Sequence, residues 1–404
     1  MIRRMALGAM VVGAVTIGLV AQTANFMLAL SSPGIEAEQD PDHRLPLAER
    51  GIHEVGVRDL ARAESRIPMK MWYPAIADPR KSATTYSYGL HVMGPGTSTA
   101  LATFSGHARH GLAPDIDGGP YPLVVLSHGF AISASSYGWL AEQIASHGFV
   151  VVAPHHEETL DPRLLWRSTV ERPADIETTL DVVERGSLDG ADMNGLVDTG
   201  AVAVVGHSYG GYTALAAGGA HLDLEAFRDS CDSAGGPGDR LAFLCGALLP
   251  NLERISQVGS PGSSVDAIVS IAGDAAMFGE SGVAVVEVPL LVIGGTADID
   301  APFEWGTELA YDHVSSTRKI EVTLEGAGHM VFAGKCESVR RVLSLAPMGF
   351  CSDPGWDGGE AKEVVGHYVT AFLLSELLGD DDATSHLGRS GPGIAELAVR
   401  SEGY

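Results

Sequence analysis

The sequence predicts an α/β fold in which helices cover both faces of a mostly parallel β-sheet. Short, continuous apolar runs are typical of strands that are buried on both faces of such a sheet. The candidate strands lie at 52–57, 67–73, 122–127, 149–153, 201–205, 267–271, 289–293 and 320–324. Helix-forming stretches separate several of them, at 135–147, 173–184, 212–220 and 361–378. Because strands and helices alternate, we expect functional residues at the carboxyl ends of the strands.

The composition fits one large folded domain and argues against a nucleic-acid partner. The chain has 404 residues, of which 45% are hydrophobic, and this is enough for one extensive core. It contains 51 acidic and 26 basic residues, which give a formal net charge of −25. A protein that binds nucleic acid needs a basic surface, so we expect no nucleic acid among its partners.

The first part of the chain, residues 1–30, has the features of an export signal or a membrane anchor. Arg3 and Arg4 supply positive charge, and residues 5–30 contain no charged side chain. A basic start before an apolar run is typical of a signal peptide, and about 25 apolar residues also suffice to span a bilayer. We expect export to the periplasm or the medium; a retained membrane anchor and a helix of the folded domain are the alternatives. Residues 31–50 are polar and contain proline, which predicts a linker.

Two segments interrupt the alternation of strands and helices. Residues 80–118 are rich in Gly, Ser and Thr, and residues 221–262 contain a Gly-rich loop and a short apolar stretch. Each is compatible with a lid over a pocket and equally with decoration at the edge of the sheet. Residues 380–404 are acidic and then rich in Gly and Ser, which predicts a flexible tail.

The four cysteines fall into two local pairs, Cys231 with Cys245 and Cys336 with Cys351. In an exported protein, an even number of cysteines at such spacing predicts disulfides. A zinc site is disfavoured, because the sequence has no Cys-x-x-Cys and no histidine close to a pair. Four free thiols are the alternative if the protein is not exported.

The segment from Gly206 to Gly210, Gly-His-Ser-Tyr-Gly, lies between a predicted strand and a predicted helix. In that context Ser208 occupies a strained turn that presents its hydroxyl above the sheet, and the small residues let strand and helix approach each other. The N–H groups at the start of a helix also favour a negatively charged oxygen. The motif therefore predicts that Ser208 is a nucleophile.

A serine nucleophile needs a base to take its proton and a carboxylate to orient that base. This topology demands the chain order serine, acid, histidine. Asp298 follows the strand at 289–293, and His329 follows the strand at 320–324. We therefore predict a Ser208–His329–Asp298 triad. Asp300 is the alternative acid, but Asp298 comes first after the strand and its Gly-Gly-Thr turn.

Other polar residues near these motifs compete for a role. His207 adjoins the nucleophile in sequence, but a neighbour on a sharp turn points elsewhere, so we predict a packing role. The run His-His-Glu-Glu at 155–158 resembles a metal-ligand cluster. Adjacent residues in an irregular loop rarely converge on one ion, so we predict no metal there.

Acyl transfer also needs donors for the oxygen that becomes negative. One is expected to be the backbone N–H of Tyr209, the residue after the nucleophile, and the other that of Phe130 in the loop after the strand at 122–127. Trp139 and Trp305 are candidates for an apolar substrate pocket beside these two residues.

At these positions the chain resembles the α/β-hydrolase superfamily. It is most similar to the branch of predicted dienelactone-hydrolase-like proteins and plasma-type platelet-activating factor acetylhydrolases, over roughly residues 52–378. The motifs that carry the resemblance are IPMKMWYP at 67–74, SHGF at 127–130, RPADI at 172–176, GHSYGG at 206–211, GTAD at 295–298 and GH at 328–329. The resemblance implies an eight-stranded sheet, a catalytic domain over 51–379, the same triad and no cofactor.

One departure bears on the substrate. Dienelactone hydrolases use a cysteine nucleophile, whereas position 208 is serine. We therefore expect an exported serine hydrolase of ordinary carboxylic esters, with short-chain, lipid-like or aromatic esters, including polyesters, as substrates. A serine peptidase or acyltransferase with the same triad and a non-catalytic binding protein are the alternatives.

Overall fold

The computed structural model describes residues 45–60, 67–91, 98–186, 193–233, 241–257, 265–333, 338–339, 353, 355–388 and 394–404. The predicted signal or anchor at 1–30, and both Cys336 and Cys351, lie outside these residues. No helix of the described part is long and apolar enough to cross a membrane.

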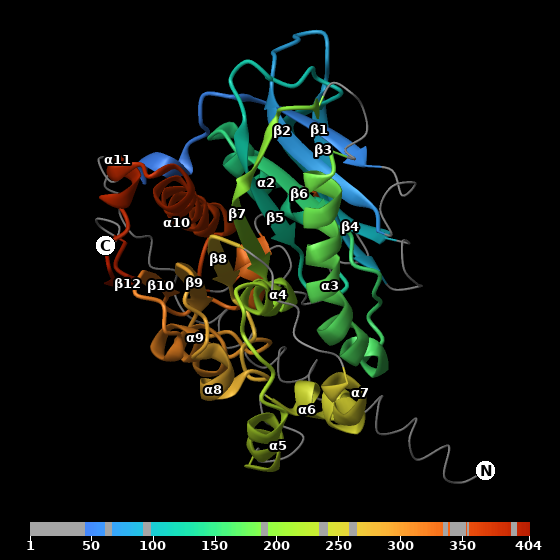
Figure 1. Cartoon of the computed structure of the whole chain (residues 1–404), viewed down its shortest axis with the longest axis vertical. Helices are drawn as coiled ribbons and strands as arrows, with labels where there is room; N and C mark the ends of the chain where they lie inside the picture. Colours follow the sequence, from blue (N-terminus) through green and yellow to red (C-terminus); the bar gives the residue numbers. More distant parts are fainter. Residues whose placement is uncertain are drawn as a thin grey trace, which may run out of the picture.

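The centre of the molecule is the predicted mostly parallel sheet (Figure 1). Its eight predicted strands are β1 (Glu54–Leu60), β2 (Met69–Ala75), β5 (Tyr121–Ser127), β6 (Val150–Pro154), β7 (Val197–His207), β8 (Ala267–Ile271), β9 (Leu290–Gly295) and β10 (Lys319–Leu324). They lie in the order β1-β2-β6-β5-β7-β8-β9-β10. Strand β2 is antiparallel to β1 and β6, and the pairs from β6 to β10 are parallel. The α/β fold class is thus confirmed.

The sheet is wider than the resemblance implied, because the described residues alone contribute twelve strands to it. Residues 80–118 contain β3 (Ala83–His91) and β4 (Ser98–His110), an antiparallel pair that joins β1 through β4 and also carries β11 (Ser338–Val339). Of the two alternatives for residues 80–118, the structure therefore has the edge element.

The expectation of a flexible tail over 380–404 is wrong for much of that segment. The short helix α11 (Asp381–Thr384) follows α10, and β12 (Leu397–Glu402) pairs antiparallel with β10. Arg400 in β12 forms ion pairs with Glu321 and Asp312, which tie the edge strand to the domain. The end of the predicted linker is also ordered: Leu47 N–H donates to Nδ1 of His367 at 3.2 Å.

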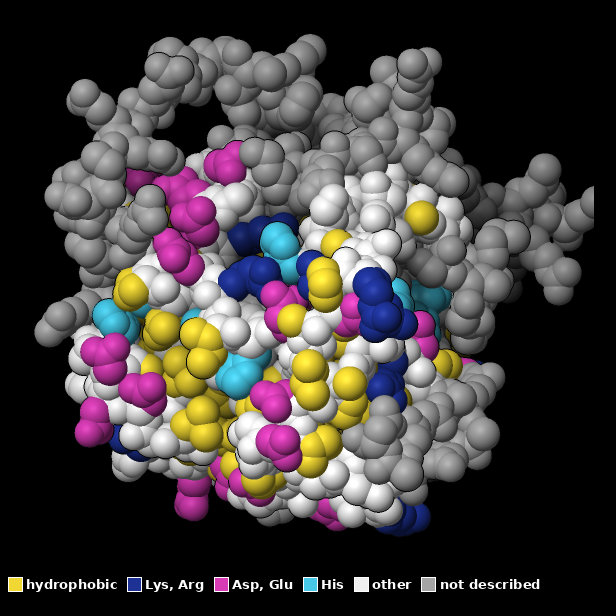
Figure 2. All heavy atoms as spheres, turned by 90° about the horizontal axis from the view of Figure 1, so that it is seen from above, with side chains coloured by type: hydrophobic (Ala, Val, Ile, Leu, Met, Phe, Trp, Pro, Cys, Tyr) yellow, Lys and Arg dark blue, Asp and Glu magenta, His cyan; other side chains and the backbone are white. Residues whose placement is uncertain are grey.

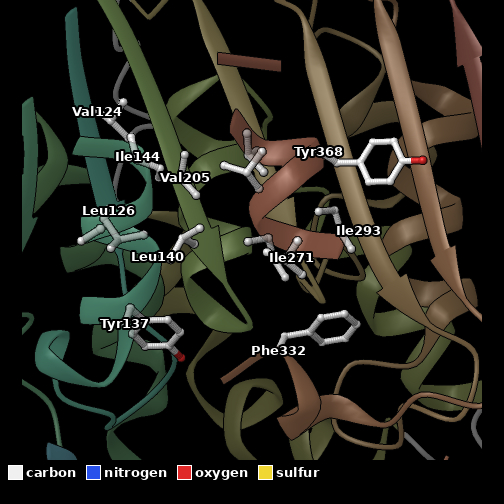
Figure 3. Packing of buried hydrophobic residues seen from close by; sticks show 14 of the residues in the cluster. Val124, Leu126, Tyr137, Leu140, Ile144, Val205, Ile271, Ile293, Phe332 and Tyr368 are labelled. Carbon is white, nitrogen blue, oxygen red and sulfur yellow. The ribbon is translucent and has the colours of Figure 1, made fainter. Parts of the chain in front are cut away.

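Helices cover both faces of the sheet, and alternate residues of each strand serve the two faces. On one face lie α2 (Gly138–Ser146) and α10 (Gly358–Leu378), and on the other lie α3 (Leu165–Glu184), α4 (Tyr209–Ala217), α8 (Gly279–Val283) and α9 (Thr307–His313). In β5, Val124 and Leu126 face the first group, and Leu123 and Val125 face the second. Figure 3 shows part of the first cluster, in which side chains from the strands meet those of α2 and α10.

The described parts of the segment 221–262, residues 221–233 and 241–257, form a helical cap at one end of the molecule (Figure 1). It consists of α5 (Leu224–Ser233), α6 (Ala242–Leu248), the short turn η5 (Leu249–Asn251) and α7 (Leu252–Ser256). The predicted disulfide between Cys231 and Cys245 is present and joins α5 to α6. Both α6 and α7 pack against α3, so the cap is attached to the face of the sheet that α3 covers.

On the face that Figure 2 shows, acidic, basic and hydrophobic side chains are interspersed. The net charge of the chain is −25, and a net negative charge attracts cations.

Leu140 of α2 is buried in the first cluster, with 1% of its surface exposed. We expect Leu140→Ala to lower the free energy of unfolding by about 2–5 kcal/mol, because it removes buried methyl groups and leaves a cavity. The matched control is Leu378→Ala, at a leucine that is 51% exposed, where we expect little change. Urea denaturation measures both, and equal losses would contradict the packing described.

Candidate active site

Ser208 lies on a sharp turn between β7 and α4. Its backbone has φ 58° and ψ −124°. This conformation is strained for a residue with a side chain, and it persists only where the surrounding structure enforces it. The surroundings do so, because Ser208 N–H donates to the carbonyl of Ile271 at 2.8 Å and the Ser208 carbonyl accepts from Gly211 at 2.8 Å. These two hydrogen bonds hold the strained turn and therefore fix the direction of the serine side chain.

The two glycines that flank this serine are required by close packing. A Cβ atom on Gly206 would lie 2.0 Å from the carbonyl oxygen of Gly210. A Cβ atom on Gly210 would lie 2.0 Å from the carbonyl oxygen of Ser127. Both contacts are with backbone atoms, which cannot shift at low cost in free energy. Any larger residue at either position would therefore clash, so both must be glycine.

The structure brings Ser208, His329 and Asp298 together. His329 Nε2 lies 2.8 Å from Ser208 Oγ, and His329 Nδ1 lies 2.7 Å from Asp298 Oδ2. Asp298 is 1% exposed, and its other oxygen accepts from the N–H groups of Asp300 and Ala301. The side chain of Asp300 is exposed, so Asp298 is the carboxylate that orients His329.

The charges around His329 favour its protonated form. Burial lowers its pKa, but the carboxylates of Asp298, Asp300 and Asp274 outweigh burial and raise the pKa to about 9. The imidazole is therefore a strong proton acceptor that is held beside the Ser208 hydroxyl.

His207, for which we predicted packing, also links two loops of the site. Its Nε2 lies 3.3 Å from the carbonyl of His329, which can only accept, so Nε2 carries the proton and Nδ1 accepts from the Tyr137 hydroxyl at 2.7 Å. That hydroxyl in turn accepts from Gly129 N–H at 3.2 Å. Burial and the neighbouring His329 hold the pKa of His207 well below its usual value, so the ring stays neutral.

Residues 127–131, which we call the oxyanion loop, carry the second predicted donor. No group in the described part of the chain accepts a hydrogen bond from Phe130 N–H or Tyr209 N–H. Both are therefore available to an oxygen bound beside Ser208. The next residue, Ala131, has φ 54°, and its N–H donates to Glu158 Oε1 at 2.6 Å, which fixes the turn after Phe130.

A buried arginine holds the oxyanion loop from below. Arg172 is fully buried; its Nη1 donates to the carbonyl of His128 at 2.6 Å and its Nη2 to that of Gly129 at 3.2 Å. The same guanidinium pairs with Glu158. Burial alone would raise the pKa of Glu158, but Arg172 outweighs it and lowers the pKa. Arg172 of the RPADI motif therefore shapes this loop.

A second serine–histidine–aspartate relay lies in the same region. His156 Nδ1 lies 2.8 Å from Asp175 Oδ2, and His156 Nε2 lies 3.0 Å from Ser127 Oγ. Ser127 is 0% exposed, so no substrate can reach it, and the relay serves to position the loop. The residues at 155–158 thus contribute to hydrogen bonding, and the described residues contain no group of His, Cys, Asp or Glu arranged to hold a metal ion.

A pocket of about 140 Å³ opens beside Ser208. Its apolar lining comes from Phe130, Leu165, Phe243, Leu244, Ile299 and Ala301. Its polar lining comes from Ser208, Tyr209, Asp274 and Asp300. The cap contributes Phe243 and Leu244, so α6 forms part of the pocket wall.

The two tryptophans that we predicted to line the pocket do not do so. Trp139 lies on α2, across the sheet from the pocket, and the Lys362 ammonium of α10 lies 5.3 Å from its ring centre. Trp305 packs into the second cluster, and its carbonyl accepts from Ala275 N–H. Trp139 thus lies on the other face of the sheet, which only the fold could show. Trp305 lies on the same face as the pocket but packs into the core instead of the pocket lining.

Asp274 and the cap residues of the pocket were not predicted from the sequence. Asp274 lies three residues after the end of β8, so the rule that site residues follow strands could have found it. Phe243 and Leu244 gave no such indication, because their place depends on how the cap folds back onto α3. Together, a nucleophile, a base, an orienting acid and two backbone donors form an arrangement that can transfer an acyl group.

Comparisons with known proteins agree with this arrangement over part of the chain. The family model for chlorophyllase matches residues 112–227, which include Ser208 but neither Asp298 nor His329. Cutinase est1 of Thermobifida alba is 33% identical over 106 residues, which are 26% of this chain and 33% of the relative. Cutinase cut1 of Thermobifida fusca is 32% identical over 106 residues, 26% of this chain and 31% of the relative.

Chlorophyllase-1 of Citrus unshiu, a chloroplast protein, is 32% identical over 101 residues, which are 24% of this chain and 29% of the relative. The chain thus spans about a third of the length of the curated relatives that it matches. The relatives are of two kinds, cutinases and chlorophyllases. The matches therefore indicate common descent, but they do not select one substrate.

The buried ion pair gives a prediction about stability. We expect Arg172→Met to lower the free energy of unfolding by about 3–5 kcal/mol, because it leaves Glu158 as an uncompensated buried charge. Adding Glu158→Gln should recover part of that loss, because no buried charge then lacks a partner. Urea denaturation measures both variants.

The matched control is Arg163→Met, which breaks an exposed pair with Asp161 and should change stability little. A loss for Arg172→Met that is as small as the loss for this control would show that the buried network does not support the fold.

Proposed function

We propose that this chain, a member of the α/β-hydrolase superfamily, is a serine carboxylic ester hydrolase. The observation that carries the proposal is the position of His329, within hydrogen-bonding distance of both Ser208 Oγ and Asp298 Oδ2. The cutinase and chlorophyllase relatives support esters rather than amides as substrates.

The reaction follows from the geometry. Ser208 Oγ attacks the ester carbonyl carbon while His329 Nε2 takes the hydroxyl proton, and Asp298 stabilises the imidazolium that forms. The N–H groups of Phe130 and Tyr209 donate to the carbonyl oxygen as it becomes negative. His329 then gives its proton to the leaving alcohol. In the second half, His329 takes a proton from water, the hydroxide attacks the acyl-enzyme, and the acid leaves as Ser208 regains its proton.

The pocket supports substrates with a compact or flat apolar group near the carbonyl. Its volume is about 140 Å³ and most of its lining is apolar, which suits a short acyl chain or one aromatic ring. Phe243 is 57% exposed and Ile299 is 47% exposed at this pocket, so a longer lipid-like or polymeric ester could continue outside it.

We also propose that the protein is exported. The disulfide between Cys231 and Cys245 supports an oxidising compartment, as does the basic and apolar start of the chain. Sequencing the amino terminus of protein recovered from the periplasm or medium tests this proposal. We expect a new terminus after the apolar run, whereas a chain that still begins at Met1 in the membrane fraction would favour an anchor.

The nucleophile is tested with a fluorophosphonate, which reacts with activated serines. We expect Ser208→Ala to lose the label and to lower kcat/KM for p-nitrophenyl esters by roughly 10⁴-fold or more. Ser385→Ala, at an exposed serine of the carboxyl-terminal region, is the matched control and should label as the wild type does. Labelling that persists in Ser208→Ala would assign the reactive serine elsewhere.

The pH profile of kcat/KM tests the electrostatics of the base. His329 must be neutral to accept a proton, and its pKa is raised to about 9, so kcat/KM should rise with pH and level off above that value. Asp300 contributes to the raised pKa, so Asp300→Asn should move the midpoint to lower pH.

The matched control for this profile is Asp381→Asn, at an exposed aspartate in α11, which should leave the midpoint in place. A midpoint that stays unchanged or moves upward in Asp300→Asn would contradict the charge arrangement around His329.

A further inference from the structure

The pocket beside Ser208 combines two carboxylates with aromatic rings. Asp274 and Asp300 both line it, and the rings of Phe130 and Phe243 belong to the same lining. Neither lysine nor arginine is among the described residues that line it. Asp298 already serves His329, and hydrolysis of a neutral ester needs no carboxylate beyond it. The presence of Asp274 and Asp300 in the pocket therefore needs an explanation.

Asp274 is the less ordinary of the two carboxylates. It is only 8% exposed, and one of its oxygens accepts from Ala276 N–H at 2.9 Å. No hydrogen bond or ion pair within the described part of the chain engages its other oxygen. Because Asp274 lines the pocket, that oxygen is available to a bound molecule.

A comparison with Glu158, an equally buried carboxylate, shows what Asp274 lacks. Arg172 pairs with Glu158 and lowers its pKa despite burial. Burial, opposed by the N–H of Ala276 and aided by the charge of Asp298, raises the pKa of Asp274 to about 6. His329 attracts Asp274, but its hydrogen bonds go to Asp298 and Ser208. A positive charge in the pocket would supply the missing compensation.

The surrounding groups suit a cation as well. Aromatic rings attract a cation that lies over their faces, and Phe130 is half-buried while Phe243 is exposed at the pocket. Asp300 is exposed at the rim and adds negative charge without closing the entrance. The net charge of −25 raises the local concentration of cationic molecules around the protein.

We propose that the pocket selects esters that carry a positive charge, an ammonium or quaternary ammonium group, which binds beside Asp274 and Asp300. This proposal rests on the proposed ester hydrolysis and names its substrate class. The cationic group lies within a few bonds of the ester, because both carboxylates share one small pocket with Ser208. It lies beside the buried Asp274 oxygen, while the ester carbonyl lies at Ser208.

The test compares two esters of the same shape that differ in charge. Acetylcholine and 3,3-dimethylbutyl acetate have the same branched end, which is cationic in the first and neutral in the second. We expect the wild type to show a kcat/KM for acetylcholine that is roughly 10- to 100-fold higher, because the quaternary ammonium gains Coulomb attraction to the buried carboxylate and cation–π contact with the rings. Asp274→Asn should abolish most of this ratio, and Asp300→Asn should reduce it.

The ratio of the two esters is the readout because it cancels any effect of Asp274 or Asp300 on the base, His329. Asp381→Asn is again the matched control and should keep the wild-type ratio. A ratio near one in the wild type, or a wild-type ratio that persists in both pocket variants, overturns the proposal.

A binding measurement separates this proposal from ester hydrolysis itself. Calorimetry with Ser208→Ala, its folding checked by circular dichroism, compares choline with the neutral alcohol 3,3-dimethylbutanol. Tighter binding of choline, lost on adding Asp274→Asn, supports the cation site even if neither ester is hydrolysed; equal binding overturns it. Hydrolysis of the neutral ester without any charge preference would keep the proposed function and reject only the cation site.

Discussion

The contact on which the site depends is the hydrogen bond between His329 Nε2 and Ser208 Oγ. The two residues are 121 positions apart in the chain and come from different strand ends. Parallel strands bring their carboxyl ends to one edge of the sheet, so β7, β9 and β10 deliver the serine, the acid and the histidine to the same place. The strained turn at Ser208 and its two glycines then point the hydroxyl toward the imidazole.

A second set of interactions keeps the oxyanion loop in place, and it is almost wholly buried. Arg172 binds two carbonyls of that loop, and the relay from Asp175 through His156 to Ser127 holds its first residue. His207 and Tyr137 connect the same loop to the backbone of His329. Buried hydrogen bonds therefore connect the oxyanion loop, which carries Phe130, to the backbone of His329.

The sequence was sufficient for the features that follow from local pattern. Short apolar segments, continuous in the central strands, identified eight strands of the sheet. The expectation that site residues follow strand ends identified Ser208, Asp298 and His329, which the structure brings together. It was insufficient where long-range packing decides. The edge strand β12 has polar residues on its exposed side, and only pairing with β10 makes it a strand. Trp139 could not be assigned to a face of the sheet, and the contacts of Arg172 required the fold.

Trapping the covalent intermediate tests most directly whether Ser208 is the nucleophile. The enzyme is mixed with p-nitrophenyl acetate, quenched in acid within the first turnovers, digested and analysed by mass spectrometry. We expect one added acetyl group on the peptide that contains Ser208 and no such group on the Ser208→Ala protein. Hydrolysis that proceeds with no acyl adduct at Ser208, or with the adduct on another residue, would contradict this assignment.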